Sequence, residues 1–174
     1  MTPRRTRLKI GRVILLAILF FFLLFIFNYF STLRPAFLFP RWKDYAVHGI
    51  DISKYQGNVD WYQLKSHEVK FVFMKATEGK ELVDNLFKTN WQGAKEAGIS
   101  RGAYHFYRPN VDWKIQARNF IEQVELGKGD MPPVLDIELI HHRNQLNLLS
   151  DIRKWLEVIE KHYGIRPIVY TYEN

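Results

Sequence analysis

The 174-residue sequence contains no cysteine. This absence excludes thiol catalysis, cysteine-ligated zinc and disulfide bonds, although it does not fix the cellular compartment. No glycine-rich phosphate-binding loop follows any apolar run, which disfavours the nucleotide-binding α/β folds. A metal site is not expected either, because His141 and His142 would point apart in a loop and no third ligand has suitable spacing. We therefore expect neither a metal nor a cofactor.

Acidic residues are missing from the first 42 positions, where seven basic residues occur. Those seven account for the formal net charge of +7, because the remaining 18 basic residues match the 18 acidic ones. The rest of the chain is therefore formally neutral and lacks the basic excess typical of nucleic-acid-binding domains. We expect no nucleic-acid partner, and the sequence gives no indication of the oligomeric state.

Residues 13–30 form one long apolar run, VILLAILFFFLLFIFNYF, which follows a basic segment at 1–12. A membrane-spanning helix needs roughly 20 apolar residues, and a secretory signal needs a shorter core followed by a small-residue cleavage site. The next residues, STLRPAFLFP, offer no clear site of that kind. We expect an uncleaved transmembrane signal anchor at 13–30 with residues 1–12 in the cytoplasm. If the segment is cleaved instead, the remainder would be secreted.

Beyond a tether predicted at 31–45, short apolar runs alternate with segments of helical spacing over residues 46–174. This order predicts a parallel sheet of about five βα units, placed outside the cytoplasm on the periplasmic or cell-wall side. The motif NVDW occurs twice, and in each copy the asparagine is predicted to cap a helix. Strands are predicted at 46–53, 70–79, 101–107, 132–138 and 166–172, and helices after Asn58 and at 84–97, 111–126 and 146–163, the last three stopped by Gly98, Gly127 and Gly164.

Polar side chains gather at the carboxyl end of each predicted strand. In barrels and open sheets built from βα units, the active site lies at that end of the strands. The pattern therefore predicts one polar rim. Its members are Asp51 and Ser53, then Lys75, Thr77 and Glu78, then Tyr104, His105 and Tyr107, then Asp136 and Glu138, and finally Tyr170, Tyr172 and Glu173.

The stretch PPVLDIE at 132–138 ends an apolar strand with two acids two residues apart. Side chains at i and i+2 of a strand share a face, with Cα atoms about 6–7 Å apart. Like charges at that separation raise the pKa of one member. Asp136, Glu138 and Asp51 on an aromatic-rich rim suit glycoside hydrolysis, in which one acid protonates the leaving oxygen. The alternative is a pair of exposed acids bridged to lysine or arginine.

Five motifs in register carry a resemblance to a known family: HGIDISKYQGNVDW (48–61), FVFMKATEG (71–79), RGAYHFY (101–107), PPVLDIE (132–138) and PIVYTY (167–172). They resemble the glycoside hydrolase family 25 lysozymes, the Chalaropsis-type N-acetylmuramidases. The resemblance implies an irregular, TIM-like (β/α) barrel that cleaves the β-1,4 bond between N-acetylmuramic acid and N-acetylglucosamine in the glycan strands of peptidoglycan.

The resemblance also implies roles for individual residues. Glu138 resembles the general acid, Asp136 its partner that orients the substrate's acetamido group, and Asp51 a third acid of the cleft. Substrate-binding positions are implied at Glu78, Tyr104 and Tyr170. Lys75 and His105 are left open as residues that orient other side chains.

The family barrel has eight strands, whereas this sequence offers about five. We therefore expect an incomplete, C-terminally truncated catalytic domain at 46–174 behind the anchor. Two alternatives remain open beside a membrane-anchored muramidase. One is a non-catalytic, membrane-anchored cell-wall-binding protein or an inactive fragment of such an enzyme, and the other is a hydrolase of chitin or another β-1,4 glycan.

Overall fold

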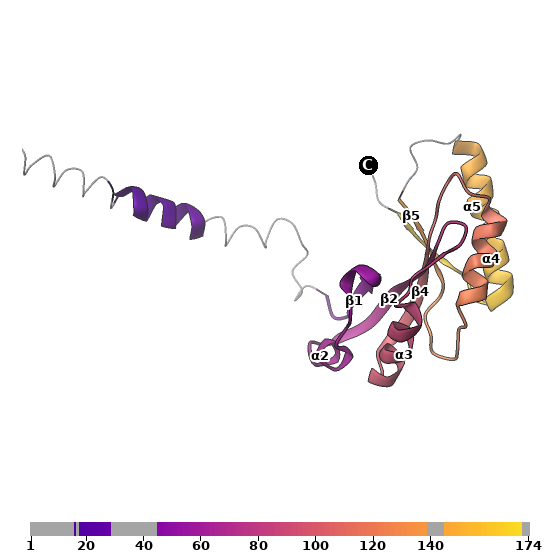
Figure 1. Ribbon diagram of the computed structural model, residues 1–174, viewed down its shortest axis with the longest axis horizontal. Coiled ribbons are helices and arrows are strands. Elements are labelled where there is room, and N and C mark those ends of the chain that lie inside the picture. The colour runs from indigo at the N-terminus through magenta and orange to yellow at the C-terminus, as the bar shows by residue number, and fades with distance from the viewer. Residues whose placement is uncertain (1–15, 17, 29–44, 139–144, 172–174) are drawn as a thin grey trace, which may run out of the picture. The chain divides into compact units, whose positions relative to one another are not determined.

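The computed structural model describes residues 16, 18–28, 45–138 and 145–171 (Figure 1). The chain divides into two compact units, Met1–Ala46 and Val47–Asn174. In the first unit, residues 18–28 are helical, and apolar side chains such as Phe21 and Phe27 are exposed. Over the described ranges, no helix is both long and apolar enough to cross a bilayer. Part of the predicted anchor at 13–30 and most of the tether lie outside those ranges, so the anchor stays a prediction.

The second unit is built on a six-stranded sheet whose parallel strands follow one another in the order β1-β2-β4-β5-β6. Strands that add in chain order, without reversal, are typical of a (β/α) barrel wall rather than of a doubly wound sheet. The five predicted strands are confirmed within about three residues. Their bounds are His48–Ile52 (β1), Val69–Glu78 (β2), Ser100–Phe106 (β4), Val134–Ile137 (β5) and Ile168–Thr171 (β6), and the short β3 (Leu82–Val83), which was not predicted, pairs antiparallel with β2.

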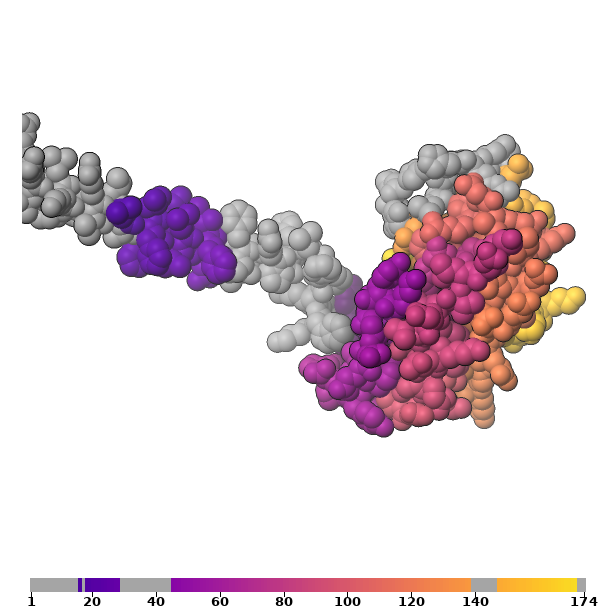
Figure 2. All heavy atoms as spheres, in the orientation of Figure 1, coloured from indigo at the N-terminus to yellow at the C-terminus, as the bar shows by residue number. Residues whose placement is uncertain are grey.

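Helices cover one face of this sheet (Figure 1), and the core lies between them and the strands. In the space-filling view, the side chains of the second unit pack closely together (Figure 2). Alternate strand residues such as Val72, Met74 and Leu135 are fully buried against Phe120 and Trp155 of the helices. This alternation leaves the other face of each strand free to line a site. The helices are α2 (Trp61–Ser66), α3 (Phe87–Ala97), α4 (Trp113–Gln123) and α5 (Gln145–Tyr163), with a short 3-10 helix η2 (Lys54–Gln56) after β1.

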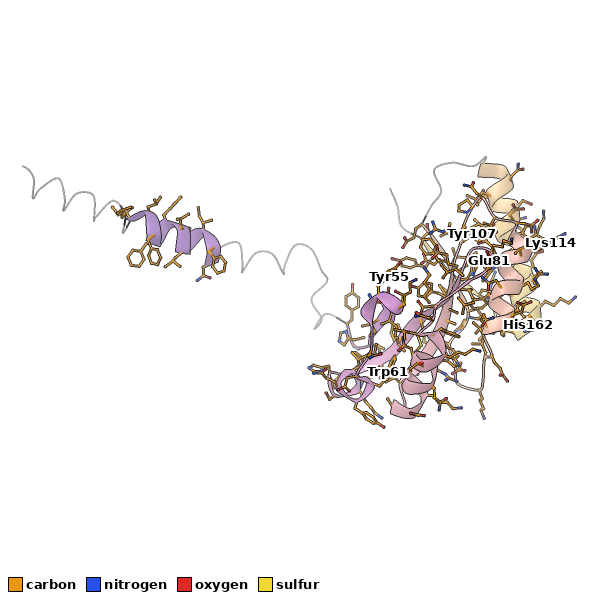
Figure 3. The ribbon with its side chains drawn as sticks, viewed as in Figure 1. Tyr55, Trp61, Glu81, Tyr107, Lys114 and His162 are labelled. Atoms are coloured by element: carbon orange, nitrogen blue, oxygen red, sulfur yellow. The ribbon has the colours of Figure 1, made fainter. Side chains whose placement is uncertain are left out.

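The two NVDW motifs do begin helices, but the capping residue differs from the prediction. Asp60 accepts a hydrogen bond from the Gln63 amide at 2.9 Å, and Asp112 accepts one from the Lys114 amide at 2.7 Å. The expected asparagine caps were therefore wrong, because the aspartate directly before each tryptophan occupies the cap position. Trp61 then opens α2 (Figure 3).

Helix ends follow the predicted glycines in two of three cases. Gly98 caps α3 in the left-handed conformation, and Gly164, with a φ of 67°, follows α5 directly. The prediction that Gly127 ends α4 was wrong. That helix ends at Gln123, and Val124 leaves it in an extended conformation while its side chain packs into the core.

Candidate active site

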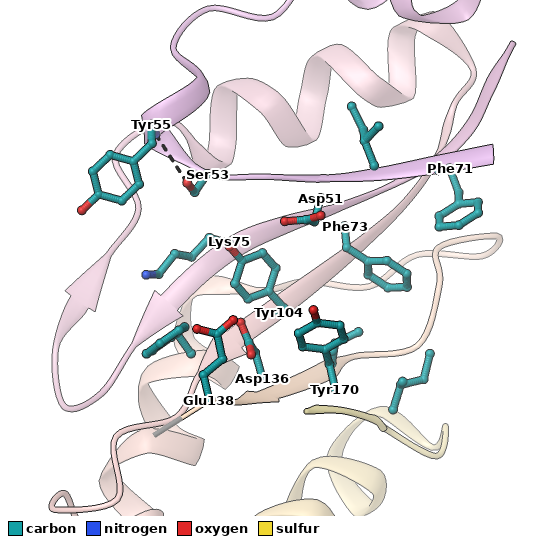
Figure 4. Close-up of a pocket in the computed structure, with 15 residues that line it drawn as sticks. Asp51, Ser53, Tyr55, Phe71, Phe73, Lys75, Tyr104, Asp136, Glu138 and Tyr170 are labelled. Carbon is teal, nitrogen blue, oxygen red and sulfur yellow. Dashed lines mark hydrogen bonds between the residues drawn. The ribbon is translucent and has the colours of Figure 1, made fainter. Parts of the chain in front are cut away.

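A pocket of about 460 Å³ opens on the sheet face that the helices leave free (Figure 4). All five parallel strands contribute to it, and β2, β4, β5 and β6 do so through alternating residues, as the strand period requires. On β2, for example, Phe71, Phe73 and Lys75 line the pocket, whereas Val72 and Met74 face the helices. The pocket is therefore the concave side of the curved sheet.

The floor of the pocket is apolar and depends on two glycines. A Cβ atom on Gly49 would lie 2.1 Å from the ring of Phe71, and one on Gly102 would lie 2.3 Å from the ring of Phe73. Each glycine is the register partner of the phenylalanine that covers it. The two rings meet edge to face, 5.9 Å apart. The missing side chains thus let both rings lie across neighbouring strands and close the bottom of the pocket.

The carboxyl ends of the strands bring the predicted acids together above this floor. Asp51 comes from β1, Asp136 from β5, and Glu138 from the residue after β5. All three line the same pocket, and Figure 4 shows Asp136 and Glu138 next to each other. Tyr104 and Tyr170, predicted to bind substrate, line the pocket as well. Tyr172 and Glu173 lie outside the described residues.

Asp136 is the acid whose environment is most perturbed. Its residue is only 8% exposed, and within the described part of the chain its Oδ1 has no hydrogen-bond partner. Burial, followed by the charges of Glu138 and Asp51, raises the pKa of Asp136 from 3.8 to about 7, against the opposing charge of Lys75. The alternative of an exposed acid bridged to lysine or arginine therefore does not hold for Asp136, which is buried. The resemblance implies that Asp136 is the partner of the general acid Glu138, and the pKa of this partner is raised.

Glu78 does not line the pocket. Its carboxylate accepts hydrogen bonds from Lys75 and from Arg108, whose Nε lies 2.7 Å from Oε1. Burial raises the pKa of Glu78, but the hydrogen bonds and charges of those two cations outweigh it, so the pKa is lowered overall. Lys75 lines the pocket, and Glu78 reaches it only through Lys75. The substrate-binding role predicted for Glu78 stays a prediction.

His105 belongs to the core and not to the site. Its ring is fully buried, lies 2.7 Å from Thr77 Oγ1 and 3.0 Å from Gln116 Oε1, and stacks on Trp155. Burial lowers the pKa of His105 to about 4, so the ring is neutral near pH 7. Its neighbour Tyr104 takes the pocket face because the strand alternates. His105 therefore does not orient the acids directly.

Several pocket residues were not predicted, among them Phe73, Phe106 and Tyr55. The i, i+2 spacing from Lys75 could have identified Phe73 and Phe71. Tyr55, which is 80% exposed, projects from η2 at the pocket rim (Figure 4). The signal for that turn is a capping box between Ser53 and Gln56, a pattern that can be read in the sequence.

Acidic and imidazole side chains do not form a metal site in the ranges that the structure describes. The pair His141 and His142 lies outside those ranges. The described residues that line the pocket bring carboxyl groups, phenols, the hydroxyl of Ser53 and one ammonium group.

A parallel βα sheet with three carboxylates at its carboxyl edge fits the class of (β/α)-barrel glycoside hydrolases. The sequence profile of the glycosyl hydrolases family 25 matches residues 50–174, and the chain belongs to that family.

Individual relatives agree with this assignment. The uncharacterized protein YegX of Escherichia coli K12 is 40% identical over 132 residues, covering 73% of this chain and 48% of YegX. Lysozyme M1 of Streptomyces globisporus is 44% identical over 136 residues, covering 72% of this chain and 46% of the lysozyme. A solved family 25 glycosyl hydrolase from Bacillus anthracis superimposes with a TM-score of 0.73 at 34% identity, covering 76% of this chain and 63% of that one. The chain thus spans about half the length of these curated relatives.

Proposed function

We propose that this protein is a peptidoglycan hydrolase, an N-acetylmuramidase that cleaves the β-1,4 bond between N-acetylmuramic acid and N-acetylglucosamine. The observation that carries the proposal is the convergence of Asp51, Asp136 and Glu138 on one pocket. Family membership supports it, as do similar chains named Lysozyme M1 and N,O-diacetylmuramidase.

In the proposed reaction, Glu138 gives its proton to the glycosidic oxygen as the bond from that oxygen to the anomeric carbon breaks. Water then supplies the hydroxyl group at the anomeric carbon and returns a proton to the site. Asp136, buried beside Glu138, would contact the acetamido group of the sugar that develops positive charge. Because burial and the charge of Glu138 raise the pKa of Asp136 to about 7, this carboxyl group gains or loses its proton near neutral pH.

The sugar rings would lie against the aromatic walls of the pocket. Tyr104 lines the pocket from β4 and Tyr170 lines it from β6, and Tyr55 is exposed at the rim. Aromatic faces provide large apolar contact area with a polar tip, which suits the faces of a pyranose ring.

Clearing of a suspension of purified cell walls tests the proposal. We expect Glu138→Gln to slow clearing by about 100-fold or more, the usual range for loss of a general acid. Glu157→Gln is the matched control, because Glu157 is an exposed residue of α5. Equal clearing rates for the parent chain and Glu138→Gln would rule out Glu138 as the acid.

A non-catalytic wall-binding protein gives a different result in a second assay. The parent chain is incubated with insoluble peptidoglycan, and both retained protein and new reducing ends are measured. Hydrolysis predicts reducing ends that accumulate with time, whereas retention without new ends favours the binding protein. Purified chitin, offered in parallel, separates a muramidase from a hydrolase of other β-1,4 glycans.

We also propose that residues 13–30 anchor the protein in the membrane and that the second unit lies outside the cytoplasm. Support comes from the basic segment 1–12 and from the exposed apolar side chains along helical residues 18–28. We expect the chain to stay in the membrane pellet after alkaline carbonate extraction and to lose this behaviour when residues 13–30 are deleted. Release of the parent chain into the supernatant would contradict the anchor.

A further inference from the structure

We propose that Lys75 is a positioning residue, held in the pocket wall by Glu78, which Arg108 also binds, so that its charge acts on the carboxylate cluster without pairing with it. The carboxylate cluster is Asp51, Asp136 and Glu138. The importance of Lys75 for catalysis rests on the proposed function. The effect of its charge on the carboxylate cluster can be measured without hydrolysis.

The first support is a clamp of close contacts around Lys75. Glu78 accepts hydrogen bonds from the Lys75 ammonium and from the Arg108 guanidinium, and the Lys75 and Glu78 side chains are only 11% and 15% exposed. The ring of Phe106 lies 4.7 Å from Lys75 Nζ and 4.9 Å from Arg108 Cζ. A cation bound by a carboxylate and an aromatic face has little freedom to move.

The second support is a backbone irregularity that makes the clamp possible. In a regular strand, residues 75 and 78 would point to opposite faces. The register of β2 against β4 shifts between Lys75 and Thr77, so two β2 residues advance while β4 advances by one. This bulge turns Glu78 toward the side of Lys75, where the two side chains meet.

The third support is the charge balance of the pocket. Among the described residues that line it, Lys75 is the only basic one, and three carboxylates line the same pocket. The other ionisable groups around Asp136 come from every element of the pocket: Asp51 (β1), Tyr55 (η2), Tyr104 (β4), Glu138 (after β5) and Tyr170 (β6).

The clamp explains why the charge of Lys75 only partly offsets the effects that disfavour ionisation of Asp136. Lys75 opposes the rise in the pKa of Asp136 that burial, Glu138 and Asp51 cause, but it does not cancel that rise. A free lysine on a flexible stem would pair directly with a carboxylate of the cluster. By binding Lys75, Glu78, which Arg108 also binds, keeps the pKa of Asp136 high enough for the carboxyl group to titrate near neutral pH.

An NMR titration of the Asp136 carboxyl carbon tests this inference in the full chain, kept in a mild detergent. Asp136→Asn identifies the signal by its loss. We expect Lys75→Met to raise the pKa of Asp136 by about one pH unit, because an opposing charge is removed. Glu78→Gln is expected to lower it, because the released ammonium turns toward the cluster. In the double variant, Glu78→Gln should add nothing to the effect of Lys75→Met.

Lys70→Met is the matched control, because Lys70 is an exposed lysine of the same strand and lies outside the pocket. Its substitution should leave the titration unchanged. An unchanged pKa in Lys75→Met would overturn the inference, as would a further change on adding Glu78→Gln to that variant. If Lys75→Met fails to fold, as judged by near-ultraviolet circular dichroism, the direction of the Glu78→Gln change decides alone.

The titration is independent of whether the chain hydrolyses peptidoglycan. If the expected changes occur in a chain that clears no cell walls, the proposed function fails and the electrostatic role of Lys75 stands. If the chain is active, the pH dependence of clearing should move in the same direction as the titration for each variant.

Discussion

The environment of Asp136 lowers the stability of the folded protein and favours acid catalysis. Its carboxyl group lies in a strand where all four residues are buried, and it is beside two other acids. Its ionised form is therefore disfavoured in the folded protein, which is unfavourable for the fold and useful for an acid catalyst.

Replacing this group should stabilise the protein at high pH. Because its folded-state pKa is raised, Asp136 gives its full stabilising contribution below about pH 4 and loses it as the pH rises through about 7. Asp136→Asn carries no charge at any pH. We expect its free energy of unfolding at pH 8 to exceed that of the parent by about 1–2 kcal/mol, after allowing for water at the open pocket mouth. Urea unfolding at pH 8 and pH 4 measures this, and an equal difference at both pH values would contradict it.

Residue spacing identified the acid pair but not the member that titrates near neutral pH. The i, i+2 rule places Asp136 and Glu138 on one face whatever surrounds them. The raised pKa of Asp136 depends on burial and on charges that include Asp51, which lies 85 positions earlier in the chain. No local pattern carries that information.

Among the elements, β2 has the most varied role. Its alternate residues form the core with the helices, the pocket floor and the basic side of the pocket, and its bulge allows Lys75 to meet Glu78. The apolar run and the terminal polar residues were visible in the sequence. The bulge and β3 were not, because both depend on pairing with neighbouring segments.

The packing of β2 against β4 predicts a sensitive position at Gly102. An added Cβ atom would lie 2.3 Å from the Phe73 ring, so Gly102→Ala must displace that ring into the pocket. We expect a loss of about 1–3 kcal/mol in the free energy of unfolding, the usual cost of overpacking. Gly127→Ala is the control, because its Cβ would make only an ordinary contact of 3.6 Å with Asp130. Urea unfolding of both variants measures the difference, and equal stabilities would show that the ring moves freely.

At the scale of the whole molecule, two buried titratable groups on opposite faces of the sheet respond oppositely to pH. Asp136 faces the pocket with a raised pKa, and His105 faces the helices with a pKa lowered to about 4. Between about pH 4 and 6.5, acidification strengthens the fold through Asp136 and weakens it through His105, because the unfolded state takes up the histidine proton first. The two effects oppose each other in the parent protein.

A variant that lacks the Asp136 carboxyl group should reveal the pH dependence of stability that His105 causes. In Asp136→Asn, the free energy of unfolding should fall by about 2–3 kcal/mol from pH 6.5 to pH 4, because the His105 effect is no longer opposed by that of Asp136. The parent protein should change much less. A series of urea unfolding curves across this range measures both slopes, and a flat response in the variant would mean that His105 is protonated in the folded state.

The sequence by itself determined the alternation of strands and helices, the shared face of Asp136 and Glu138, and the polar carboxyl ends of the strands. These features follow from the periods of strand and helix, which act over a few residues. Tertiary structure decided the rest: that His105 turns to the core while Tyr104 turns to the pocket, that Glu78 binds Lys75 and Arg108, and that Asp136 has the raised pKa. Burial and electrostatics depend on groups brought together from distant positions, so they are set only when the sheet has formed.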